Sequence, residues 1–462
     1  MSILKNKNHI FFTGIGGIGM SGIAEILLER GFRVSGSDRQ LSDITSYLAD
    51  KDAQIYEGHH AENLQDVDLL VYSSAVPETN PERQQARRSG IEQIRRAEML
   101  AEIMTGKNNI AIGGTHGKTT TTALCAKIVI DAGLDPTVVI GGKLKNLKTN
   151  ARLGQGDIFI TEADEYDRSF LALSPNIAVL TTLEEDHLDC YQDLTDIKQT
   201  FIQFANKIPE DGFIICCFDD PRIREIIPNL IGPAITYGTH PNADYRAINL
   251  KYEENGSYFD IQNKTRKIES VSLQIPGQHN ILNALAAFTV GEVLMIPVEK
   301  IKTALHHFTG VDRRFEIKGV INDIMIVDDY AHHPTEVAVT IASARSGWNR
   351  NLIVVFQPHL FSRTRDFFKE FTVALAKADE VILADIYPAR EEPIPDVDSN
   401  LIINEAEKQG YHNFQYIAKK AAIETYLLNH TKSGDMIITM GAGDIGTVSE
   451  NLLTKLSSLN NS

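Results

Sequence analysis

The sequence predicts an α/β protein of three domains, and three observations support this fold class. Short apolar runs, typical of buried strands, alternate with helical stretches along the chain. A glycine-rich turn between a strand and a helix occurs near the N-terminus and again after residue 110, so the same pattern begins twice. A third series of apolar strands begins near residue 312. The 462 residues are enough for roughly two to four domains.

Composition and charge exclude several classes of protein. The formal net charge of −16 argues against a sequence-independent grip on nucleic acid or on an anionic membrane. The 4 cysteines form no C-x-x-C pair, which is typical of reduced thiols. Glycines interrupt the N-terminal apolar stretch, which argues against a signal peptide, and no apolar run is long enough to predict a membrane span. We therefore expect a cytoplasmic protein without nucleic-acid or membrane partners.

The first predicted domain spans residues 1–106 and opens with a strand, a glycine turn and a helix. The turn "GIGGIGMSG" contains Gly14, Gly16 and Gly19, a complete G-x-G-x-x-G, and Asp38 follows about twenty residues later. This pattern is the dinucleotide-binding fingerprint of a Rossmann-like domain. It raises the hypothesis of a nicotinamide-dependent oxidoreductase, although the same glycines could hold the diphosphate of another nucleotide.

The remainder of this domain carries one more clear strand. The apolar run near 68–76 ends in small polar residues that include Ser73 and Ser74. Helical sequence is expected from there to about residue 106.

The second predicted domain, residues 107–311, opens with a phosphate-binding loop one residue shorter than usual. The stretch "AIGGTHGKTT" follows an apolar strand and starts a helix, but Ile112 stands where the usual G-x-x-x-x-G-K-[ST] has its first glycine. Backbone N–H groups and the helix N-terminus can hold phosphate oxygens. Lys118 can reach the terminal phosphates, and the Thr119 hydroxyl can bind Mg²⁺. The pattern predicts a P-loop-type ATPase domain with a variant loop.

Acidic residues gather at the ends of two further strands of this domain. "TEADEYD" holds Glu162, Asp164, Glu165 and Asp167, and "LEEDHLD" adds more carboxylates around His187. Alone, such clusters are usually solvated strand ends. Here both belong to the domain of the phosphate loop, where a carboxylate and an imidazole would suit a second metal ion beside ATP.

The second domain ends with a different pattern. Residues 244–276 alternate and turn at Asn255 and Gly256, which predicts antiparallel strands. The helix predicted for "HNILNALAAFTVGEVLM" places Asn280 and Asn283 on one face. These amides could read an adenine edge, or they could simply cap and pack.

The third predicted domain, residues 312–462, is Rossmann-like, with apolar strands that each run into polar residues. Ligands of open α/β sheets lie at those carboxyl ends. Histidines and arginines there suit a carboxylate or a phosphate, although single arginines are more often surface residues. The candidates are Asp329, Tyr330, His332, His333, His359, Arg363 and Arg365. At the domain boundary, Arg313 and Arg314 could meet ATP phosphates on closure, or form an interdomain salt bridge.

With these residues assembled, the chain resembles the Mur ligase family along nearly its whole length. The short loop "GTHGKTT" matches that family's ATP motif. The other matching stretches are "GIGGIGMSGIAE", "EADEYDRSFLALSPNIAVLTTLEEDHLD", "GQHNILNALAA", "DRRFE", "DDYAHHPTE" and "QPHLFSRTRDF". Ordered motifs of this number are highly specific, whereas any one alone is not.

The resemblance implies an enzyme that uses ATP and Mg²⁺ to join L-alanine to the lactyl carboxylate of UDP-N-acetylmuramate through an acyl phosphate. Such an enzyme serves peptidoglycan precursor synthesis, and through it cell shape and division. We expect a monomer or a weak homodimer. A sister ligase of cell-wall recycling, which joins a peptide to the same UDP-sugar, shares most motifs. A P-loop nucleotide switch is a rival of another class, beside the oxidoreductase.

The resemblance also implies roles for matching residues. The ATP site would comprise Gly114, Thr115, His116, Gly117, Lys118, Thr119, Thr120, Asn280, Asn283, Arg314 and Asp329. Metal ligands would be Thr119, Glu162 and His187. The UDP-substrate would bind Gly14, Gly16, Gly17, Gly19, Asp38, Ser73 and Ser74, and Tyr330 and Arg363 would bind near the amino acid. Catalysis would fall to Lys118, Arg314, His332 and His359, with one of the histidines as base. Leu360 departs from relatives that carry arginine there.

Overall fold

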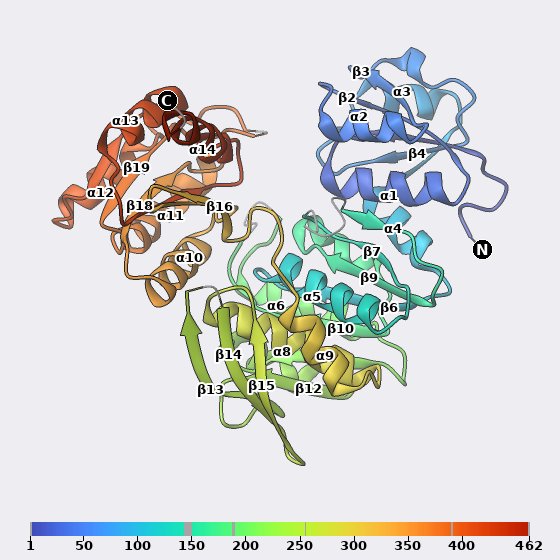
Figure 1. Cartoon of the computed structure of the whole chain (residues 1–462). Coiled ribbons are helices and arrows are strands. Elements are labelled where there is room, and N and C mark those ends of the chain that lie inside the picture. The colour runs from blue at the N-terminus through green and yellow to red at the C-terminus, as the bar shows by residue number, and fades with distance from the viewer. Residues whose placement is uncertain (1, 143–149, 187–189, 255, 390, 461–462) are drawn as a thin grey trace. The chain divides into compact units, whose positions relative to one another are not determined.

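The computed structural model describes residues 2–142, 150–186, 190–254, 256–389 and 391–460 (Figure 1). By its internal contacts the chain forms two compact units. The first comprises Met1–Asn249, Phe259–Val271 and Ile281–Phe308. The second comprises Leu250–Tyr258, Ser272–Asn280 and Thr309–Ser462.

The first sheet is parallel and runs in the order β3-β2-β1-β4-β5. Its strands are β1 (His9–Thr13), β2 (Arg33–Asp38), β3 (Gln54–Glu57), β4 (Leu69–Tyr72) and β5 (Glu92–Arg95). The accompanying helices are α1 (Ile18–Glu29), α2 (Asp43–Asp50), η1 (Ala61–Asn63), α3 (Pro81–Arg88) and α4 (Arg96–Met104). The predicted strand, glycine turn and helix at the N-terminus are confirmed.

The expectation of helical sequence up to about residue 106 is wrong in one segment. Edge strand β5 separates α3 from α4 and pairs with β4. Only Ile94 of this strand is buried, so its apolar signal is too weak to be recognised as a strand.

The second sheet runs in the order β15-β14-β13-β12-β11-β10-β6-β9-β7-β8. Its strands are β6 (Asn108–Gly113), β7 (Thr137–Val139), β8 (Ala151–Arg152), β9 (Ile158–Ala163), β10 (Ile177–Leu180), β11 (Phe213–Cys217), β12 (Ala234–Gly238), β13 (Tyr245–Glu253), β14 (Gly256–Gln262) and β15 (Lys267–Leu273). The helices are α5 (Lys118–Asp131), η2 (Tyr166–Ala172), α6 (Leu194–Ala205), α7 (Pro221–Ile226), η3 (Ile227–Asn229), α8 (Gln278–Val293) and α9 (Val298–His306). Asn255 of the predicted turn lies outside the described residues.

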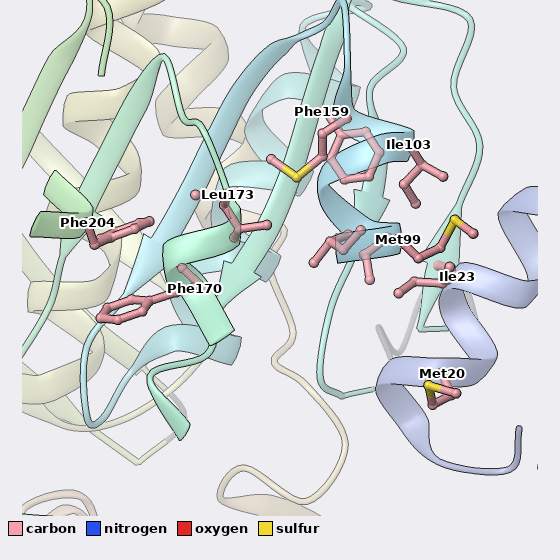
Figure 2. Packing of buried hydrophobic residues seen from close by; sticks show 14 of the residues in the cluster. Met20, Ile23, Met99, Ile103, Phe159, Phe170, Leu173 and Phe204 are labelled. Carbon is pink, nitrogen blue, oxygen red and sulfur yellow. The ribbon is translucent and has the colours of Figure 1, made fainter. Parts of the chain in front are cut away.

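One hydrophobic cluster joins the first sheet to strands β6–β11 of the second sheet. Figure 2 shows Met20 and Ile23 of α1 with Met99 and Ile103 of α4, and Phe159 of β9 beside them. The same cluster continues to Phe170, Leu173 and Phe204. A core shared in this way explains why the first sheet and most of the second belong to one compact unit.

The third sheet runs in the order β16-β17-β21-β18-β19-β20, parallel except for the β16–β17 pair. Its strands are β16 (Glu316–Ile321), β17 (Ile324–Asp329), β18 (Asn351–Phe356), β19 (Glu380–Leu383), β20 (Phe414–Tyr416) and β21 (Asp435–Met440). The helices are α10 (Pro334–Gly347), α11 (Phe361–Leu375), α12 (Asn400–Lys408), α13 (Lys420–His430) and α14 (Gly446–Asn460). Successive residues such as Ile326 and Val327 enter different core clusters, as expected for strands buried on both faces.

The α/β fold class with three domains is therefore confirmed, while the cuts near residues 106 and 311 stay predictions. Cys125, Cys190, Cys216 and Cys217, all within the described ranges, are not joined by disulfide bonds. Within the described ranges, no helix combines the length and apolar composition that crossing a membrane requires.

Candidate active site

The variant phosphate loop connects the end of β6 to the start of α5. Gly114 and Gly117 take left-handed φ values of 142° and 83°, and Gly117 is the N-cap of α5. The N–H groups of Thr115 and His116 donate to Thr182 O at 2.9 Å and Thr182 Oγ1 at 2.8 Å. The segment that follows β10 thus helps to hold the loop in place by accepting these N–H groups.

Lys118 opens α5 and is surrounded by carboxylates. Its Nζ lies 2.8 Å from Oε2 of Glu165. Burial alone would lower the pKa of the Lys118 ammonium, but the charges of Glu165, Asp164 and Glu162 outweigh it and the pKa is raised. Lys118 is therefore a cation, as a phosphate-binding lysine must be.

Two predicted metal ligands are neighbours of this lysine: Thr119 follows it on α5, and the charge of Glu162 acts on its ammonium group. Thr119, almost buried, lies in the first turn of α5. Glu162 of β9 pairs in register with Ile112 of β6, and its Oε1 accepts the Gly141 N–H at 2.6 Å. Hydroxyl and carboxylate oxygens are the donors that Mg²⁺ prefers, so these side chains fit that ion. The predicted ligand His187 lies outside the described residues.

Asn283 of α8 faces the last glycine of the loop. A Cβ at Gly117 would lie 2.6 Å from Asn283 Oδ1, and Thr121 Oγ1 donates to that oxygen at 3.2 Å. Asn280, on the same helix, donates through Nδ2 to Pro276 O at 2.6 Å. The side chain of Asn283 is thus held against the loop. The hydrogen bond of Asn280 instead joins the first turn of α8 to the preceding segment.

The first glycine loop closes on an acidic residue. Gly14, at φ 84°, donates its N–H to Ser37 O at 2.8 Å. Gly16 donates to Asp38 Oδ2 at 2.8 Å, and Gly17 is the N-cap of α1. The predicted association of these glycines with Asp38 is thus present in the structure.

A cavity of about 160 Å³ lies between elements of the first and second sheets. Ser74, Arg95, Arg96, Arg168 and Ser169 are among its lining residues. Ser73, by contrast, accepts the Ala75 N–H on its own turn at 3.3 Å. Of the predicted substrate residues, Ser74 lines this cavity, whereas none of its arginines was predicted, because single arginines carry no motif.

Arg96 lies between the start of α1 and the acidic residues that follow β9. A Cβ at Gly19 would lie 3.0 Å from Arg96 Nη1, so the guanidinium packs against the first turn of α1. Its Nη2 lies 3.1 Å from Oδ2 of Asp164, two residues after Glu162. A cation is therefore fixed between the first glycine loop and the strand end that carries Glu162.

In the second unit, Asp329 ends β17 and is buried. Its carboxylate accepts the N–H groups of Phe315 at 2.6 Å and Ala331 at 2.8 Å. Burial raises the pKa of the Asp329 carboxyl to about 6, although the nearby Arg314 charge opposes the shift. Asp329 therefore holds the segment around Arg314 in place.

Arg314 is positioned by a strained loop. Both neighbours, Arg313 and Phe315, have left-handed φ values of 58° and 43°. The guanidinium of Arg314 lies 5.2 Å from the ring centroid of Tyr330, and its Nη1 is 3.7 Å from Glu336 Oε1. The loop thus places Arg314 beside Tyr330, a residue that is predicted to bind near the substrate alanine.

His332 and His359 lie close together at the carboxyl edge of the third sheet. Their ring centroids are 5.7 Å apart. Nδ1 of His332 lies 2.9 Å from the carbonyl oxygen of Tyr330, which favours a proton on Nδ1 and a lone pair on Nε2. The ring of His359 stacks on the ring of Tyr387, with the two centroids 5.9 Å apart. Tyr387 was not predicted from the sequence.

The other candidates near the third sheet differ in their burial. Arg363 of α11 is 8% exposed, whereas Arg365 is an exposed residue that pairs with Asp366 at 2.7 Å. His333 caps α10 by accepting the Thr335 N–H at 3.4 Å. Leu360 is the N-cap of α11 with φ 71°, an unusual conformation for leucine.

The chain matches family models along most of its length. The model of the "Mur ligase family, catalytic domain" matches residues 9–108. The "Mur ligase middle domain" matches residues 112–291, and the "Mur ligase, glutamate ligase domain" matches residues 313–443.

Proteins named UDP-N-acetylmuramate–L-alanine ligase are similar over nearly full length. The one from Syntrophotalea carbinolica is 48% identical, covering 96% of this chain and 97% of its own. The one from Geobacter sulfurreducens is also 48% identical, covering 97% of each chain.

Solved structures agree with this similarity. UDP-N-acetylmuramate–alanine ligase from Thermotoga maritima has a TM-score of 0.84 at 28% identity, covering 97% of this chain and 99% of its own. A murein peptide ligase from Psychrobacter arcticus has a TM-score of 0.74 at 25% identity, covering 97% and 98%.

Proposed function

The chain belongs to the Mur ligase family, and on that premise we propose that it joins L-alanine to the lactyl carboxylate of UDP-N-acetylmuramate at the expense of ATP. The observation that carries the proposal is the variant phosphate loop, which presents Lys118 at the start of α5 in one compact unit with the first glycine loop. Relatives that are 48% identical over nearly the whole chain bear the name of this activity. They give no support to an oxidoreductase.

The reaction requires activation of a carboxylate, which is a poor electrophile. A lactyl carboxylate oxygen attacks the γ-phosphorus of ATP, ADP leaves, and an acyl phosphate forms. The alanine amine then attacks the acyl carbon, and inorganic phosphate leaves. Lys118 and Arg314 offset the negative charge that moves between these oxygens. The amine must lose a proton, and Nε2 of His332 is a suitable acceptor because Nδ1 is engaged by Tyr330 O.

Thr119 and Glu162 would hold Mg²⁺, with His187 as a further ligand implied by the family motif. When bound, Mg²⁺ neutralises charge on the phosphates. The N–H groups at the start of α5 would orient the phosphates. Asn283 lies against the loop, where it can contact the nucleotide.

The UDP-substrate would span the two glycine-rich loops. Its diphosphate would lie at the N-terminus of α1, next to Gly14, Gly16 and Gly17. Its lactyl carboxylate must reach the ATP phosphates bound by Lys118. The cavity lined by Ser74 and Arg96 belongs to the same unit as Lys118 and could hold the intervening part of the substrate.

We expect the Arg96→Ala variant to raise KM for UDP-N-acetylmuramate by about tenfold or more, with KM for ATP little changed. The reason is that Arg96 is a cation held between the first turn of α1 and the carboxylate of Asp164. Steady-state kinetics with each substrate varied in turn measures this. Arg87→Ala, which removes a surface partner of Glu78, is the matched control. An unchanged KM for the UDP-substrate would exclude Arg96 from its path.

We expect Arg363→Ala to raise the apparent KM for alanine by about tenfold or more, with affinity for the UDP-substrate little changed. Arg363 is a nearly buried cation on α11, suited to a small carboxylate. Arg345→Ala, which removes an ion pair between α10 and Asp379 in the same unit, is the control. Selective loss of UDP-substrate binding would contradict this assignment.

The activity itself is tested by product analysis. The enzyme is incubated with Mg²⁺-ATP, UDP-N-acetylmuramate and either L-alanine or an alanyl peptide. The products are then identified by mass spectrometry. We expect the mass of the alanyl product. Exclusive formation of the peptide product would assign the chain to the recycling ligases instead.

A further inference from the structure

Lys118 is held by a carboxylate that the reaction described above does not use. Its Nζ lies 3.0 and 2.8 Å from the two carboxylate oxygens of Glu165. It also lies 2.5 Å from the carbonyl oxygen of Gly114 and 3.2 Å from that of Thr115. An ammonium group has three N–H donors, so these acceptors can take all of them. The lysine therefore folds back on its own loop.

Both partners of this ion pair are shielded from solvent. The Lys118 side chain is 16% exposed and that of Glu165 is 5% exposed. The backbone of Glu165 is also fixed, because its carbonyl oxygen accepts the Tyr191 hydroxyl at 2.5 Å and the Arg168 N–H at 3.0 Å. Glu165 is thus a rigidly placed acceptor.

Stability alone is a weak explanation for this pair. Removing two charges from water costs about as much as their attraction returns, so buried ion pairs often contribute little to folding. The pair does place two anionic oxygens on the ammonium that a nucleotide needs. Those oxygens occupy donors that phosphate oxygens would otherwise take.

We propose that Glu165 is a positioning residue of the nucleotide site, whose carboxylate holds Lys118 over the loop and competes with nucleotide phosphate for its ammonium. This inference rests on the proposed function only in taking the loop to be an ATP site. Binding of a nucleotide exchanges the carboxylate for phosphate oxygens. The measured affinity is therefore reduced by the fraction of molecules in which Lys118 is engaged by Glu165.

The test is the Glu165→Gln variant, titrated with ADP and Mg²⁺ by calorimetry. Glutamine keeps the size and the acceptor oxygen but removes the charge. We expect Kd for ADP to fall by about tenfold. Kd for AMP, which lacks the phosphates that reach Lys118, should not change. A purely structural defect would weaken binding, so a gain that depends on the outer phosphates reports competition.

Two further variants complete the experiment. Glu225→Gln is the matched control, because Glu225 forms a Lys–Glu pair with Lys198 in the same unit, and it should leave Kd for ADP unchanged. Glu165→Asp keeps the charge but shortens the reach, so we expect a smaller fall in Kd, about two- to threefold. Thermal unfolding without nucleotide shows whether Glu165→Gln is folded. If it is not, the Kd of Glu165→Asp for ADP tests the competition instead.

The outcomes separate the inference from the proposed function. If the unaltered protein binds ADP but folded Glu165 variants bind it equally or more weakly, the competition is overturned and the ligase proposal stands. If the unaltered protein does not bind ADP at all, the nucleotide assignment of the loop fails, and the inference fails with it.

Discussion

Replacing Lys118 by alanine is expected to lower the rate of ligation on the order of 10²-fold or more while the protein stays folded. Lys118 is the cation at the start of α5, and its raised pKa keeps it charged at neutral pH. In the transition state for phosphoryl transfer, that charge offsets the charge on the γ-phosphate oxygens. Initial rates of L-alanine-dependent phosphate release measure the loss.

The matched control for Lys118 lies on the same helix. Lys127→Ala removes an ion pair with Asp131 on the exposed side of α5 and should leave the rate within about twofold of the unaltered protein. Lys118→Ala also leaves the buried Glu165 carboxylate without this partner, so its unfolding temperature should fall. Near-normal turnover by a folded Lys118→Ala protein would defeat the assignment of the loop.

Gly114→Ala is expected to abolish measurable nucleotide binding. Gly114 has φ 142°, which L-residues rarely adopt. A Cβ there would lie 2.0 Å from Thr181 Oγ1 and 2.9 Å from the backbone nitrogen of Thr182. The loop must therefore move away from Thr181 and Thr182, and the start of α5 no longer presents its N–H groups to a phosphate. Calorimetric titration with ADP and Mg²⁺ measures the effect.

The control variant Gly133→Ala shows whether a loss of ADP binding in Gly114→Ala comes from steric collision or from a strained φ alone. Gly133, after α5, also has a left-handed φ, 85°, but a Cβ there would meet nothing within 4 Å. This variant should lose about 1 kcal/mol of stability and keep ADP affinity. Equal ADP affinities for Gly114→Ala and the unaltered protein would show that the loop geometry does not form the nucleotide site.

The sequence predicted the central strands and both glycine-rich loops because their signals are local. The turn before α1 and the loop before α5 each combine an apolar strand, glycines and a helix start within a few residues. Strand β5 was missed because an edge strand with one buried side chain carries little periodicity.

The contacts that organise the site were not predictable in the same way. The pairing of Lys118 with Glu165 joins residues 47 positions apart, and that of Arg96 with Asp164 joins residues 68 apart. Each depends on which strand ends lie side by side, which follows from sheet order rather than from local sequence. "TEADEYD" marked a cluster of carboxylates but not which of them would face the lysine.

The central claim is tested most directly by phosphate release from Mg²⁺-ATP in the presence of UDP-N-acetylmuramate, with and without L-alanine. The account predicts sustained release only when both substrates are present. Release that does not depend on L-alanine, or no release with both substrates, would contradict it.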